Sequence, residues 1–123
     1  MHRLRVGVEF GCWPVWEERQ DGVANVPPAA LPISSLLRTD LERWAAWYEQ
    51  QYDSANPVDS GFDDRAEAIR FNQAGEELRR RLADELEGVA SVTFRPYPVH
   101  REPAPIRQAR TGIDQDDAGA EPF

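Results

Sequence analysis

The stretch Leu4-Arg5-Val6-Gly7-Val8-Glu9-Phe10 decides the fold, because it fixes the first element of the domain. Apolar side chains occupy every second position, with Arg5, Gly7 and Glu9 between them. A period of two is typical of a β-strand that has one buried face and one face in water. The sequence therefore predicts an N-terminal strand, to which the later elements add.

A β-hairpin is predicted directly after this strand. The pair Asp21-Gly22 separates a short β-prone run that ends at Arg19 from the run Val23–Val26. Glycine supplies the positive φ that a tight hairpin turn needs. Three prolines over residues 27–32 then interrupt regular structure and lead the chain to its first helix.

Two amphipathic helices are predicted next. The first begins near Ser34, whose hydroxyl can accept a hydrogen bond from an unpaired backbone N–H. The second begins around Asp63 or Asp64, where Asp64 and Glu67 have the spacing of a capping box, and it runs to Glu87 and stops at Gly88. Helical spacing predicts one buried stripe of Leu37, Leu41, Trp44, Tyr48 and Tyr52, and another of Phe71, Gly75, Leu78, Leu82 and Leu86.

Residues 91–95 alternate again and predict a last strand that ends at Pro96. The fold class is therefore α+β with two layers. A sheet of three or four strands, antiparallel or mixed, packs on an antiparallel helix pair in the order β-hairpin-α-α-β. Residues 1–95 are predicted to form a single domain, and residues 96–123 a Pro-rich, acidic and disordered tail.

Composition limits the possible partners. The chain has 123 residues, of which 22 are acidic and 14 basic, so its net charge is −8. Such acidity disfavours nucleic acid and anionic membranes as direct partners. No apolar run is long enough to span a membrane, and the N-terminus lacks the apolar core of a signal peptide. The single cysteine, Cys12, fits a reducing compartment, so we expect a cytoplasmic protein.

Signals of catalysis are few. His2 and His100 lie next to the initiator and in the Pro-rich tail, and Cys12 has no fixed histidine near it. The acidic segment between the helices does not fit a calcium loop, because its glycine position is occupied by Val58. Acids at a helix start are explained by dipole compensation. We therefore assign no catalytic residue, no metal site and no cofactor.

A glycine in the middle of the second helix needs a reason, because it destabilises a helix by about 1 kcal/mol relative to alanine. Gly75 lies on the buried stripe. We hypothesise that it lets a bulky residue of the first helix, Trp44, approach closely.

Other apolar residues fit either the core or a partner surface. Phe62, Ala66 and Ile69 lie on the face of the second helix opposite its buried stripe. Either the 53–62 segment folds over them, or they face another protein. Tryptophan also serves both purposes, since it is common in cores and dominates binding hot spots. The residues concerned are Trp13, Trp16 and Trp47.

Several short motifs occur in a fixed order within residues 4–95. They are Trp13-Pro14-Val15-Trp16, Leu31-Pro32-Ile33-Ser34, Trp44-Ala45-Ala46-Trp47-Tyr48, Ser60-Gly61-Phe62 and Phe71-Asn72-Gln73-Ala74-Gly75-Glu76-Glu77-Leu78. In this order they resemble a family of small, largely uncharacterised bacterial proteins that is common in actinobacteria. The resemblance implies no particular reaction and no catalytic residue.

The leading hypothesis is a non-enzymatic, acidic protein-binding module, of the kind that inhibits a toxin or confers immunity to it. A negative surface accelerates association with a positive one, so the expected partner is a basic protein. The predicted contact residues surround the segment between the helices: Trp47, Asp53, Asp59, Phe62, Asp63, Asp64 and Ile69.

Two alternatives stay open at this point. A metabolite- or metal-binding protein or enzyme would have its site between the sheet and the first helix, lined by Glu9, Trp16, Tyr48 and Tyr52. A structural subunit of a larger assembly would dock through its tail, residues 97–123.

Overall fold

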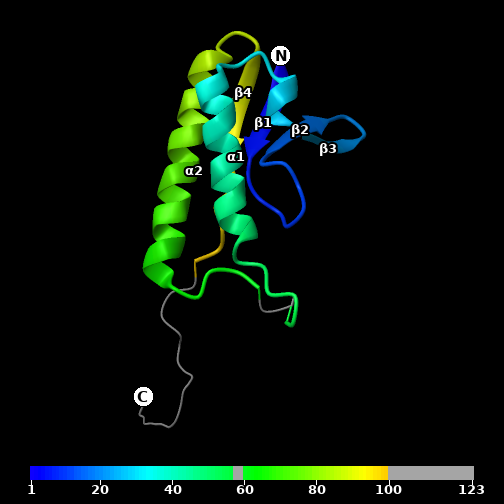
Figure 1. Cartoon of the computed structure of the whole chain (residues 1–123). Helices are drawn as coiled ribbons and strands as arrows, with labels where there is room; N and C mark the ends of the chain where they lie inside the picture. The colour runs from blue at the N-terminus through cyan, green and yellow to red at the C-terminus, as the bar shows by residue number, and fades with distance from the viewer. Residues whose placement is uncertain (57–59, 100–123) are drawn as a thin grey trace.

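The computed structural model describes residues 1–56 and 60–99 and shows two layers. Two antiparallel helices lie side by side over one face of a four-stranded sheet (Figure 1), so the predicted α+β class is confirmed. The elements are β1 (His2–Val6), β2 (Val15–Arg19), β3 (Gly22–Val26), the short 3₁₀ helix η1 (Pro28–Ala30), α1 (Ser35–Glu49), α2 (Arg65–Glu85) and β4 (Ala90–Phe94).

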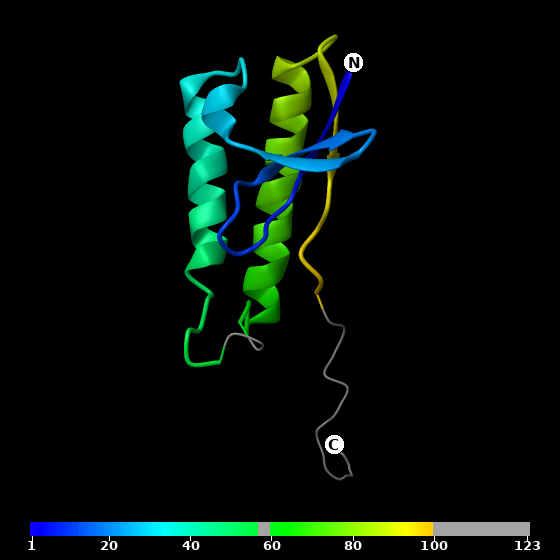
Figure 2. The same ribbon diagram turned by 90° about the vertical axis from the view of Figure 1, so that its right-hand side faces the viewer.

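The sheet is mixed, with the strand order β3-β2-β1-β4. Strand β1 runs antiparallel to β2 and parallel to β4, so Val6 lies opposite both Val15 and Phe94. The predicted hairpin is formed by β2 and β3, and it projects from the body of the molecule in Figure 1 and crosses in front of the helices in Figure 2. Gly22 closes its turn with a φ of 143°.

Strand β1 ends earlier than the alternating pattern predicts. It stops at Val6, and the Gly7 N–H then donates to the Pro14 carbonyl at 3.0 Å, which starts a loop instead of a longer strand. Phe10 leaves the sheet and stacks on Tyr48 of α1, with ring centroids 4.3 Å apart. The apolar residue at position 10 therefore serves packing between the loop and α1.

Helix α1 begins as predicted, with Ser34 as its N-cap. The Ser34 hydroxyl oxygen accepts from the Leu37 N–H at 3.2 Å. The Glu85 carboxylate accepts from the Ser34 N–H at 2.6 Å and from its hydroxyl at 2.7 Å, which ties the start of α1 to the end of α2. Because α1 ends at Glu49, Tyr52 lies beyond the helix and is exposed, so its predicted place on the buried stripe is wrong.

Helix α2 begins at the predicted cap and ends close to the predicted stop. The Asp64 carboxylate accepts from the Ala66 N–H at 3.0 Å. The Glu67 carboxylate accepts from the indole N–H of Trp47 at 2.8 Å, so it links the two helices. The helix ends at Glu85, and Gly88 follows in the left-handed region with a φ of 81°. Within residues 1–56 and 60–99, no helix is long and apolar enough to cross a membrane.

The close approach predicted at Gly75 is confirmed. A Cβ atom at this position would lie 2.6 Å from the Trp44 ring and 2.6 Å from the Phe94 ring. Trp44 stacks on Phe71, with centroids 4.6 Å apart, and its indole N–H donates to the Phe71 carbonyl at 2.9 Å. This contact joins α1, α2 and β4 at the centre of the core.

Candidate functional site

An aromatic cluster fills the end of the molecule where α1 ends and α2 begins. Phe62 packs against Phe71 and Tyr97, with centroid distances of 4.9 and 5.1 Å, and against Trp47 at 5.9 Å. The Phe62 N–H donates to the Tyr97 hydroxyl at 3.0 Å. Gly61 makes room for that hydroxyl, since a side chain at position 61 would collide with it. Phe62 is therefore covered by neighbouring rings.

Tyr97 is held in the cluster by Asn72 of α2. The Asn72 amide accepts from the Tyr97 N–H at 2.8 Å and donates to the Tyr97 carbonyl at 2.8 Å. Such reciprocal pairing fixes the backbone at this point. Residues beyond 99, including His100, lie outside the described residues, and the domain boundary at residue 95 stays a prediction.

The acidic residues predicted to contact a partner have different roles at this end. The Asp53 carboxylate accepts from the Ala55 N–H at 3.0 Å and so shapes the segment after α1. Asp64 caps α2. Asp63 is exposed and makes no hydrogen bond or ion pair within residues 1–56 and 60–99. Asp59 lies outside the described residues.

The apolar residues of the predicted contact set are less accessible than the acids. Trp47, Phe62 and Ile69 are all half-buried. The structure thus brings Trp47 and Phe62 together as a partly covered aromatic floor, and places exposed acids around it. Ala66, on the same face of α2, is exposed.

The four residues proposed to line a site between sheet and first helix, Glu9, Trp16, Tyr48 and Tyr52, each contact another residue in the structure. Glu9 forms an ion pair with Arg95 at 3.0 Å, and the Trp16 indole N–H donates to the Gly7 carbonyl at 3.1 Å. Phe10 covers the ring of Tyr48, and burial raises the pKa of the Tyr48 hydroxyl. Across the described ranges, no three side chains of His, Cys, Asp or Glu gather in a way that suits a metal ion.

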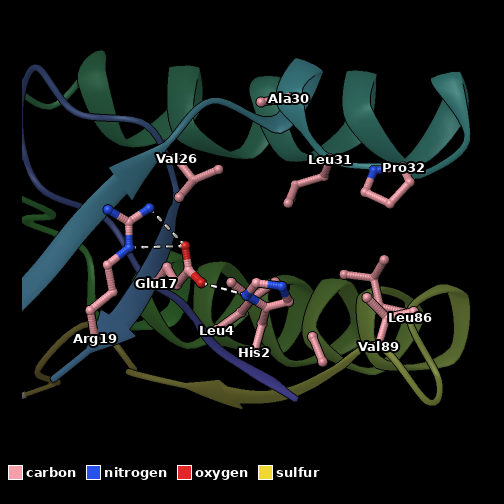
Figure 3. A pocket seen from close by; sticks show the side chains of 11 residues that line it. His2, Leu4, Glu17, Arg19, Val26, Ala30, Leu31, Pro32, Leu86 and Val89 are labelled. Carbon is pink, nitrogen blue, oxygen red and sulfur yellow. Dashed lines mark hydrogen bonds and ion pairs between the residues drawn. The ribbon is translucent and has the colours of Figure 1, made fainter.

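The opposite end of the molecule has a cavity of about 320 Å³ between η1 and the sheet (Figure 3). Its walls are mostly apolar and include Leu31 and Leu86. At its polar end the Glu17 carboxylate accepts from His2 at 2.6 Å and from Arg19 at 2.9 Å. These hydrogen bonds hold the pKa of Glu17 below its usual range, and the hydrogen bond from His2 has the larger effect. The polar groups there are thus already paired with each other.

A groove runs between the 11–14 loop and α1, and we call it the Trp13 groove. Its volume is about 390 Å³. Trp13 stands at its edge and is 46% exposed, whereas Pro14 below it is buried. Its residues are Gly11, Cys12, Trp13, Pro14, Glu42, Ala45, Ala46 and Glu49.

The sequence signal for the helix wall of this groove is the spacing 42, 45, 46 and 49, which places four side chains on one side of α1. Two small residues between two glutamates do not by themselves mark a groove in a sequence. Which side of α1 the loop would approach depends on the sheet, and therefore on tertiary structure.

The chain is a small two-layer α+β protein, with a mixed four-stranded sheet under two helices. Residues 2–97 match the family model described as Serratia CdiI immunity protein-like. The chain belongs to this family, and it is a toxin immunity protein that binds a toxin. No curated protein matches it. The family description names Serratia, and nothing supports the actinobacterial origin that the resemblance suggested.

Proposed function

We propose that this immunity protein acts in the cytoplasm and binds a basic surface of its toxin through the end of the molecule between α1 and α2. The contact set is the one predicted from the sequence, Trp47, Asp53, Asp59, Phe62, Asp63, Asp64 and Ile69. Its described members support the proposal because they combine an aromatic floor with exposed carboxylates.

The observation that carries the proposal is the unpaired carboxylate of Asp63. Many acids elsewhere are matched to an arginine: Asp40 pairs with Arg81 at 2.9 Å, and Glu76 pairs with Arg79 at 2.7 Å. Asp63 has no such partner among the described residues, although it lies next to the aromatic floor. A charge left unpaired in water adds little to folding but is free to attract a cation of a partner.

Charge reversal tests this proposal. The Asp63→Arg variant and the control Glu87→Arg change the net charge equally, and Glu87 is an exposed residue after the far end of α2. CdiI immunity proteins bind the toxin domain of their cognate CdiA protein. Binding of this purified toxin domain is measured by surface plasmon resonance at low and high salt. We expect Asp63→Arg to weaken the affinity about 10-fold at low salt, mainly through a slower association rate, and to reduce the salt dependence. Glu87→Arg should change it less than about twofold.

Equal effects of the two variants would show that only net charge matters, and would overturn the proposed location. Binding by both variants at the wild-type rate would overturn it as well. Asp64 is unsuitable for reversal because it caps α2, and its loss would destabilise the helix by about 1 kcal/mol.

A further inference from the structure

The loop that carries Trp13 is fixed in place although the tryptophan is exposed. The Trp13 N–H donates to the Asn25 side-chain oxygen at 2.8 Å, and the Asn25 amide donates back to the Trp13 carbonyl at 2.8 Å. On the other side, the Gly11 N–H donates to the Glu49 carboxylate at 2.7 Å. The 11–14 loop is thus held by α1 at Gly11 and by β3 at Trp13.

Trp13 is 46% exposed, so it presents an apolar ring to solvent from a fixed loop. Its indole N–H has no hydrogen-bond acceptor within the described part of the chain. Because the backbone is already ordered, a partner that packs on this ring loses little conformational entropy in the loop. Exposed, preorganised tryptophans of this kind are frequent hot spots of protein–protein interfaces.

The helix wall of the groove carries negative charge that no arginine of the described chain neutralises. Glu42 makes neither a hydrogen bond nor an ion pair there, and the only such contact of Glu49 is the Gly11 N–H. By contrast Asp40, two positions before Glu42, is paired with Arg81. Between the two glutamates the floor consists of Ala45 and Ala46, which are small and apolar.

We propose that the Trp13 groove receives an arginine side chain of the toxin. The aliphatic part of the arginine lies on Ala45 and Ala46, the guanidinium stacks on the Trp13 ring, and its N–H groups donate to the Glu42 carboxylate. Arginine suits the groove better than lysine because its planar head stacks on an indole and donates two parallel hydrogen bonds. This inference rests on the proposed function, since it assumes a toxin with a basic surface.

The groove can be tested without the toxin. The ¹⁵N-labelled full chain is titrated with acetyl-Gly-Arg-Gly-amide and followed by two-dimensional NMR. We expect a saturable shift of the Trp13 indole N–H and of the backbone amides of Gly11 and Ala46, with a Kd in the millimolar range. The analogue with citrulline, which has nearly the shape of arginine without its charge, should bind at least about 10-fold more weakly, and so should the lysine analogue.

Two variants and a control complete the experiment. Glu42→Gln and Trp13→Ala should each weaken the arginine peptide at least about 5-fold, whereas Glu87→Gln, an exposed change after the end of α2, should leave it unchanged. Retained circular dichroism spectra show that the variants are folded.

Absence of a saturable shift, or equal binding of the arginine and citrulline peptides, overturns the inference. Equal binding of arginine and lysine overturns the choice of arginine. Either result leaves the proposed function standing if Asp63→Arg still weakens toxin binding. If the arginine peptide binds while Asp63→Arg has no effect, the proposed location between α1 and α2 fails instead.

Discussion

The tryptophans on the two sides of α1 differ in whether their indole N–H groups have a hydrogen-bond acceptor. On the flank that faces α2, the indole N–H groups of Trp44 and Trp47 donate to the Phe71 carbonyl and to Glu67, at 2.9 and 2.8 Å. On the flank that faces the 11–14 loop, the indole N–H of Trp13 has no acceptor among the described residues. The indole donors on the side toward α2 are therefore satisfied within the chain, whereas the indole donor of Trp13 faces solvent. A buried donor must be satisfied internally, but a solvent-facing one is free to bind.

The largest change in stability is expected at Gly75, on the side of α1 that faces α2. We expect Gly75→Leu to lower the free energy of unfolding by about 3 kcal/mol or more, because the new side chain must displace both Trp44 and Phe94. For a domain of this size that corresponds to a fall in Tm of about 12 °C or more. Thermal unfolding followed by circular dichroism measures it, and an unchanged Tm would show that the rings yield without cost.

The Ser34–Glu85 link between α1 and α2 should have a smaller effect. Ser34→Ala removes the N-cap of α1 and is expected to cost about 1 kcal/mol in urea unfolding at neutral pH. A control for Ser34→Ala must introduce alanine at a position where the backbone tolerates it. Gly88→Ala does not meet this condition, because the φ of 81° at Gly88 strains any other residue. Thr39→Ala, an interior position of α1, is the better match.

The same link predicts a pH dependence. Hydrogen bonds from the Ser34 side chain, and then from its backbone, hold the pKa of Glu85 below its usual range. The folded protein therefore binds this proton less readily than the unfolded chain, so the stability it confers is present above the unfolded pKa and is lost as the pH falls through the folded one. The free energy of unfolding of the wild type should exceed that of Glu85→Gln at pH 7, and the two free energies should converge in strong acid. A constant difference at all pH values would contradict this.

The smallest change in stability is expected at Trp13, on the side of α1 that faces the 11–14 loop. Trp13→Ala should lower the free energy of unfolding by no more than about 1 kcal/mol, because Trp13 is 46% exposed and its indole N–H has no acceptor among the described residues. Chemical denaturation measures this value. A loss as large as that of a buried tryptophan, about 3 kcal/mol, would place Trp13 in the core.

Local patterns predicted most of the elements because each carries its own physical signal. Ser34 and Asp64 are caps as expected, Gly22 closes the hairpin, and the stripe through Phe71 and Leu82 is buried. The alternating pattern predicts too long a β1, because Phe10 keeps the period of the strand although its ring packs on Tyr48 from a loop. An aromatic ring can contact the helices either from a strand of the sheet or from a loop. The period of the sequence alone does not distinguish these two cases.

The candidate sites were harder to predict, since exposure depends on contacts between distant segments. Phe62 is covered by Tyr97, which lies 35 residues away along the chain. Trp13 and Trp16 belong to one short motif, yet Trp13 is exposed whereas Trp16 is half-buried, with its indole N–H donating to the Gly7 carbonyl. Neither outcome follows from the composition around these residues.

The parallel pairing of β4 with β1 has a consequence for synthesis of the protein. His2 is made among the first residues, but its neighbour Ala90 follows only after both helices. The central strand therefore waits with one edge open until most of the chain has been translated, and pairing across so long a separation is intrinsically slow. A product that terminates within α2 lacks β4, which is one of the two strands that pair with β1. A gene truncated there should therefore give no protection, even though it still encodes most of the chain.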